Sequence, residues 1–158
     1  SAAWGEGKRL LEHAIAERLD FVFESTLGGR TMAALLGQAA DAGFHVRMWY
    51  VGLANPELHL ARVRARVQRG GHDIPERDIR RRYDASRSNL VDLLPKLSEL
   101  RVYDNSTDTD PHAGVPPAPR LILHLAAGRI VAPRDLAKTP TWARPIAAAA
   151  MQLPTRRP

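Results

Sequence analysis

The chain has 158 residues, a net charge of +6 and a pI near 10.5, with 44% hydrophobic and 25% charged residues. This balance is typical of one globular domain, and no apolar run approaches the about 18 residues of a membrane span, so we expect no membrane partner. The absence of cysteine excludes disulfides and thiolate chemistry, and we expect a cytoplasmic location.

The first half of the chain alternates helical and extended patterns. Apolar spacing predicts a helix over residues 4–19, and the apolar run 21–23 predicts a short buried strand after it. Residues 30–42 return to helical spacing and end at Gly43, which is a typical helix stop. The stretch 44–53 is rich in branched and aromatic residues and predicts a second strand.

The second half begins with Asn55-Pro56-Glu57, a strong helix start in which a capping side chain precedes proline and an acid. The predicted elements from there on are a helix over 55–70, a helix over 74–97, a strand at 101–103, a proline-rich loop at 111–119, a hairpin of strands 121–125 and 129–132, and a helix at about 145–153. This alternation predicts an α/β domain with a parallel sheet flanked by helices. In such sheets ligands lie at the carboxyl ends of the strands.

The polar residues after the first predicted strand are the first candidate site. Glu24 directly follows the strand, where a carboxylate can accept a substrate hydroxyl or organise a magnesium shell. Alternatively, Glu24 caps the next helix and Gly28-Gly29 only make a turn. The spacing alone leaves both interpretations open.

The excess positive charge is concentrated in one segment. Nine arginines lie between residues 62 and 87, at positions 62, 64, 66, 69, 77, 80, 81, 82 and 87, against four acids. Two helices joined by Gly70-Gly71 can form a mobile flap whose guanidinium groups meet phosphate charge, with His72 as a residue of that lid. The alternative is a solvated helix pair whose arginines pair with nearby acids.

The third candidate is Asp104-Asn105, which follows the last strand of the predicted α/β alternation. These residues can shape a base-binding loop or can simply form a turn. The histidines show no metal-ligand spacing, so we predict no transition metal held by the protein. A G-x-S-x-G elbow is absent, so a hydrolase triad has no anchor.

The motifs FESTLGGRT, RGGHDIPERDIRRRY and VYDNS occur in this order, and together they resemble the zeta-toxin family of P-loop kinases. The similarity covers residues 3–150 and is greatest to the branch described as predicted ABC-type ATPases. It implies a kinase domain over residues 1–150 with a lid at about 66–82, and a polar tail at 151–158. It further implies ATP and Mg²⁺ as cofactors, a small-molecule hydroxyl such as one of UDP-N-acetylglucosamine as acceptor, and a toxin that an antitoxin protein would partner.

The resemblance also implies roles for single residues. Arg66 and Arg82 would be catalytic lid residues that clamp the transferring phosphate, with Arg69 and Arg81 as the alternatives to this pair. Three residues would bind the substrate, namely Glu24, Thr26 and Arg30. Four residues would bind the nucleotide, namely Arg69, Arg81, Asp104 and Asn105.

The sequence departs from the family pattern in one important respect. No G-x-x-x-x-G-K-[ST] motif occurs, and Gly5-Glu6-Gly7-Lys8 is too short to replace it. We therefore expect that the phosphate loop, its central strand and the catalytic aspartate lie upstream, and that this chain alone is inactive. Two alternatives stay open. One is a non-catalytic basic module that binds nucleic acid or an acidic partner. Tyr83 is the single aromatic residue of the arginine-rich segment, so this segment is poorly equipped to stack on the bases of a single strand. The other is a pseudo-kinase that re-pairs its sheet or dimerises.

Overall fold

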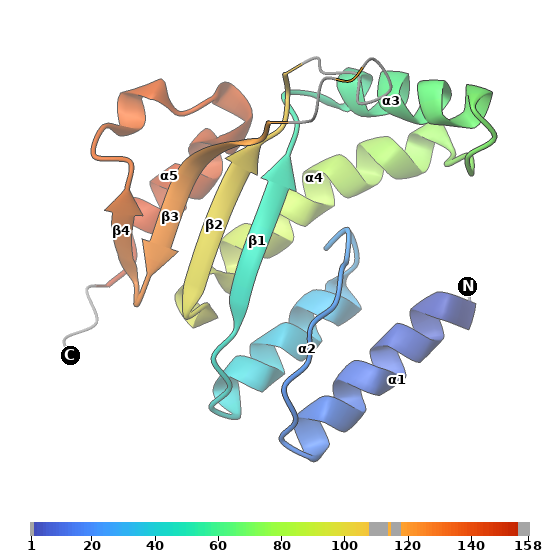
Figure 1. Cartoon of the computed structure of the whole chain (residues 1–158). Helices are drawn as coiled ribbons and strands as arrows, with labels where there is room; N and C mark the ends of the chain where they lie inside the picture. Colours follow the sequence, from blue (N-terminus) through green and yellow to red (C-terminus); the bar gives the residue numbers. More distant parts are fainter. Residues whose placement is uncertain (1, 108–113, 115–117, 155–158) are drawn as a thin grey trace.

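Four strands form a single sheet in the order β1-β2-β3-β4, with helices before and between them (Figure 1). The computed structural model describes residues 2–107, 114 and 118–154. The main elements are α1 (Ala2–Ala16), α2 (Arg30–Asp41), β1 (Arg47–Gly52), α3 (Pro56–Gln68), α4 (Glu76–Leu93), β2 (Glu99–Asp104), β3 (Arg120–Ala126), β4 (Arg129–Ala132) and α5 (Arg144–Met151). Short 3₁₀ turns span Leu94–Lys96, Leu136–Lys138 and Thr141–Ala143.

The sheet is mixed. β1 and β2 are parallel, with Tyr50 opposite Val102, whereas β3 pairs antiparallel with β2 on one side and with β4 on the other. The predicted parallel sheet is thus confirmed for one strand pair, and the predicted hairpin is confirmed as β3 and β4. The fold class is α/β, as predicted, and the arrangement of helices around the sheet is consistent with a P-loop kinase-like fold.

One face of the sheet carries the core. Helices α4 and α5 lie against that face (Figure 1). The most deeply buried side chains come from these helices, from the 3₁₀ turn after α4 and from the strands: Leu90, Leu94, Leu100, Val102, Leu125 and Ile146. On the opposite face of β1, Trp49 and Val51 are 56% and 55% exposed. A smaller cluster of Leu11, Met32 and Leu35 joins α1 to α2. Of the helices among the described residues, none is both long and apolar enough for a membrane crossing.

The predicted strand 21–23 is wrong. This segment is extended but joins no strand ladder, and Val22 is 95% exposed while Phe21 and Phe23 stack on each other with ring centroids 5.6 Å apart. An extended segment becomes a strand only when a neighbour completes its backbone hydrogen bonds. Within the described residues, β1 pairs on one side only, with β2. Most of the predicted loop 111–119, and residues 155–158 of the predicted tail, lie outside the described residues.

Candidate functional site

Helix α4 is hydrogen-bonded to the loop of residues 24–29, which follows the extended residues 21–23. The buried side-chain amide of Asn89 donates from Nδ2 to the carbonyl oxygen of Leu27 at 2.7 Å. The backbone N–H of Leu27 donates to Ser25 Oγ at 3.1 Å, and the Leu27 side chain is itself buried. Leu27 has a positive φ of 51°, which turns the chain toward α2. The loop carrying Glu24 and Thr26 is therefore tied to α4 by a non-local hydrogen bond.

The same loop contacts a lid arginine. A methyl group on Gly28 would lie 2.8 Å from Cγ and 3.0 Å from Cβ of Arg82. Arg82 is half-buried and forms no ion pair with an acid among the described residues. The structure thus brings one of the two predicted catalytic arginines against the predicted substrate segment.

Glu24, Thr26 and Arg30 are exposed, and Glu24 forms no hydrogen bond or ion pair with another described residue. The N-cap of α2 is Gly29, which has extended backbone angles and no capping side chain, so the alternative interpretation of Glu24 as the cap is wrong. Arg30 opens α2 and lines a groove of about 610 Å³ between α2 and α4, together with Asn89, Asp92 and Lys96.

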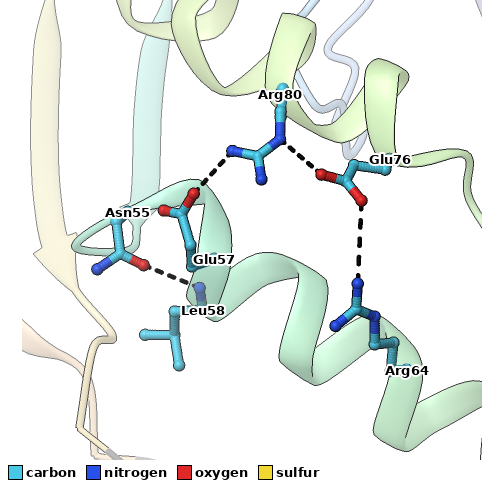
Figure 2. A network of polar contacts seen from close by, with 6 residues as sticks. All are labelled: Asn55, Glu57, Leu58, Arg64, Glu76 and Arg80. Carbon is cyan, nitrogen blue, oxygen red and sulfur yellow. Dashed lines mark hydrogen bonds and ion pairs between the residues drawn. The ribbon is translucent and has the colours of Figure 1, made fainter.

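Helices α3 and α4 form a hairpin that ion pairs hold together (Figure 2). Arg80 contacts Glu57 at 2.7 Å and Glu76 at 2.8 Å, and Arg64 lies 3.9 Å from Glu76. The hydrogen bond from Arg80 lowers the pKa of Glu57, and the hydrogen bonds to both carboxylates raise the pKa of Arg80. Helix α3 starts where the sequence predicts, because Asn55 Oδ1 accepts a hydrogen bond from the N–H of Leu58 at 2.8 Å.

Several other arginines of this segment also have local partners. Arg81 pairs with Asp78 at 3.0 Å, and Arg87 pairs with Asp84. Arg66 donates to the carbonyl oxygen of His72 at 3.1 Å and so closes the turn at the tip of the hairpin. The solvated-pair interpretation therefore describes much of the arginine cluster. The structure places Arg66 at the hairpin tip, and no contact among the described residues joins it to Arg82.

The hairpin is attached to the end of β1 by one side chain. The hydroxyl of Tyr83 donates to the carbonyl oxygens of Leu53 and Ala54 at 3.1 and 2.9 Å. The rings of His59 and Tyr83 meet edge to face, with their centroids 5.7 Å apart. Burial raises the pKa of Tyr83. Burial, and then the charge of Arg62, lowers the pKa of His59. These contacts place the base of the hairpin beside the carboxyl end of the strand.

Asp104 ends β2 next to Gly52, and its carboxylate is engaged within the protein. Asp104 Oδ1 accepts hydrogen bonds from Ser106 N at 3.2 Å, from Ser106 Oγ and from Trp142 Nε1 at 3.2 Å. Asp104 Oδ2 lies 3.7 Å from Arg120. The hydrogen bonds between Asp104 and Ser106 agree with the interpretation of Asp104 as a turn former. Sequence reasoning missed Trp142, because nothing in the pattern around it indicates a partner so far back in the chain.

The predicted site residues form separate groups. The 24–30 loop meets Arg82, while Asp104 and Asn105 lie at the strand ends with Trp142. No contact within the described part of the chain joins Glu24 to Asp104. Arg69 is the C-cap residue of α3. Arg62, in the middle of the same helix, donates to the carbonyl oxygen of Thr107 at 2.9 Å. Across residues 2–107, 114 and 118–154, no cluster of three or more acidic or histidine side chains could hold a metal ion.

Comparison with known proteins adds to this geometry. Residues 1–112 match the zeta toxin family. An uncharacterised protein of Haemophilus influenzae is 39% identical over 74 residues, which are 47% of this chain and 53% of that protein, so the chain spans about half the length of this curated relative. No solved structure matches the chain. Because the family match covers well over half of the sequence, this chain belongs to the zeta toxin family.

Proposed function

We propose that this chain is part of an ATP-dependent phosphotransferase that phosphorylates a hydroxyl of a small molecule, and that the enzyme acts as a toxin. Family membership supports the reaction class, and the contact of Arg82 with Gly28 is the structural observation that carries the proposal. Cβ and Cγ of Arg82 pack against Gly28 in the loop that bears Glu24, and Arg82 has no acidic partner among the described residues, which supports its role as a phosphate clamp. Phosphoryl transfer depends on such fixed cations, because charge spreads over the transferring oxygens.

The chemistry assigned to the loop follows from its exposed groups. Glu24 would accept a hydrogen bond from the acceptor hydroxyl, Thr26 would contact the same substrate, and Arg30 would lie at the groove between α2 and α4. We propose a nucleotide sugar such as UDP-N-acetylglucosamine as the acceptor. Its anionic diphosphate suits the arginines of this region.

ATP would arrive with Mg²⁺, which prefers phosphate oxygens, water and one or two carboxylates over a cage built by the protein. Arg82 packs against Gly28, and Glu24 is the exposed carboxylate nearest to Gly28 in the sequence. Glu24 would therefore be the one carboxylate that contacts the magnesium ion. The magnesium ion would neutralise phosphate charge. Arg69, Arg81 and Asn105 remain the proposed contacts to the nucleotide, and Arg66 remains the second proposed clamp.

The proposed reaction needs a phosphate loop, and the printed sequence contains no such motif. We propose that a strand bearing this loop pairs with the free edge of β1, on the side where the extended segment 19–26 runs in Figure 1. That strand would give the segment a neighbour and let it join the sheet. The 158-residue chain by itself is then inactive.

The alternative of a non-catalytic basic module needs arginines that are available to an acidic partner. Of the nine arginines, Arg64, Arg80, Arg81 and Arg87 form ion pairs within α3 and α4, which leaves fewer guanidinium groups for such a partner. An antitoxin protein remains part of the proposal, as the partner that the toxin activity would require.

The test joins the chain to a zeta-toxin phosphate loop and measures ATP consumption with UDP-N-acetylglucosamine. We expect turnover, and we expect Arg82→Ala to lower it about a thousandfold, as for other arginines that meet a transferring phosphate. Arg129→Ala, on the exposed surface of β4, is the matched control and should leave turnover unchanged. Absence of turnover with any hydroxyl acceptor, or equal turnover in the two variants, contradicts the proposal.

A further inference from the structure

The C-terminal part of the chain reaches the predicted nucleotide end of the sheet. Residues 118–154 lie outside the family match, which ends at residue 112, yet they supply β3, β4 and α5 to the core. Trp142 lies two residues before the start of α5. Its side chain is only 6% exposed and donates a hydrogen bond from Nε1 to Asp104. This segment therefore contacts the same strand end that carries the predicted nucleotide residues.

The indole ring of Trp142 occupies space that only glycine leaves open at the end of β1. A methyl group on Gly52 would fall 2.2 Å, 2.4 Å and 2.8 Å from three carbon atoms of this ring. The ring also lies against Tyr50, with centroids 6.4 Å apart. The indole is therefore packed closely against the end of β1, and in this packing its N–H points to Asp104.

The Asp104 carboxylate accepts hydrogen bonds from other groups of the protein. Ser106 contributes two donors and Trp142 contributes one, all directed to Oδ1, while Arg120 faces Oδ2. The carboxylate is 14% exposed. Because three donors from the protein already meet Oδ1, Asp104 organises the turn from residue 104 to residue 106.

Asn105 is held by its backbone and presents its side chain. Its N–H donates to the carbonyl oxygen of Gly52 at 2.9 Å, which links the ends of β1 and β2. Its side-chain amide makes no hydrogen bond to another described residue and is partly exposed. An asparagine amide can pair with the edge of adenine through one donor and one acceptor.

We propose that Trp142 is a positioning residue for nucleotide recognition: it fixes Asp104, and the turn that Asp104 braces aims the Asn105 amide at the adenine edge of ATP. This assignment rests on the proposed function for its ligand. It gives different roles to two of the four residues predicted to bind the nucleotide, since Asp104 acts within the protein and Asn105 meets the base.

The test compares Trp142→Phe, which keeps a ring over Gly52 but removes the donor, with Ile146→Val, which trims a fully buried side chain of the same segment. Each protein is joined to a zeta-toxin phosphate loop, hydrogen exchange of the Asn105 and Ser106 amides is measured in both, and ATP and CTP are titrated onto each. We expect Trp142→Phe to speed exchange at these amides and to reduce the ATP-to-CTP affinity ratio about tenfold, the effect of losing about one hydrogen bond to the base.

Asn105→Ala should reduce the same ratio without changing the exchange of Ser106, and Asp104→Leu provides a second way to break the brace should the tryptophan variant fold poorly. Unchanged exchange in Trp142→Phe, or an equal loss of base preference in Ile146→Val, overturns the assignment. If the wild-type chain joined to a phosphate loop binds neither nucleotide, the proposed function fails, and the exchange measurement still decides whether Trp142 braces Asp104.

Discussion

Arg82 lies directly against Gly28, and this contact joins the lid helix to the loop that carries the proposed substrate acid. A methyl group on Gly28 would come within 2.8 Å of Arg82 Cγ, closer than packed carbon atoms approach. We expect Gly28→Ala to displace Arg82 and to lower the free energy of unfolding by about 1–3 kcal/mol, as overpacking does. Urea titration followed by tryptophan fluorescence measures this.

The neighbouring glycine provides the control. Nothing lies within 4 Å of a methyl group placed on Gly29, and its φ of −118° suits alanine. Gly29→Ala should therefore leave the urea midpoint close to that of the wild type. Equal midpoints for the two variants would show that Arg82 does not pack against Gly28 in solution.

A second prediction concerns the hydrogen bond between Asn89 and the carbonyl oxygen of Leu27, which has a length of 2.7 Å. Asn89→Ala leaves that carbonyl without its partner at a buried position, so we expect a loss of about 1–3 kcal/mol in the free energy of unfolding. Limited proteolysis should also cut faster within residues 24–29. Ser88→Ala, at the adjacent exposed position of α4, should change neither result. A stable, uncut Asn89→Ala protein would be inconsistent with this anchor.

A third prediction concerns pH. Burial, and then the charge of Arg62, lowers the pKa of His59 below its ordinary value of 6.5, so the folded chain binds this proton more weakly than the unfolded chain does. The stability linked to His59 is therefore present above about pH 6.5 and is lost as the pH falls below that value. Urea midpoints measured across this range should fall on acidification, and His59→Gln should flatten the slope.

His72 is the matched control for the pH series, because it is exposed at the tip of the same hairpin. His72→Gln should keep the slope of the wild type. A slope that survives in His59→Gln would assign the pH dependence to another group.

A fourth prediction concerns the free edge of β1. Val51 is 55% exposed on a strand that pairs on one side only among the described residues, an arrangement that favours association with another edge. We expect the chain to self-associate in sedimentation velocity experiments, and we expect Val51→Lys to reduce the association. Met151→Lys, at a 68% exposed position of α5, should not reduce it. A wild-type chain that stays monomeric at high concentration would contradict this expectation.

The helices could be predicted from the sequence because their signals are local. The Asn55-Pro56 start of α3, the apolar spacing of α1, α2 and α4, and the hairpin of β3 and β4 all agree with the predictions. The ion pairs of Arg81 with Asp78 and of Arg87 with Asp84 are also local, since each joins residues three apart on one helix turn. That spacing was a signal in the sequence that much of the arginine cluster is paired.

The strand at 21–23 failed because a strand is defined by its neighbour, which an apolar run cannot specify. Chain pattern alone determined that the protein is an α/β domain with helices, a hairpin and a basic helical hairpin at these positions. Only the tertiary structure decided that Arg82 meets Gly28, that Asn89 holds Leu27 and that Trp142 braces Asp104. Each of these contacts joins residues far apart in the chain, and their meeting depends on how helices and strands pack, which no local spacing encodes.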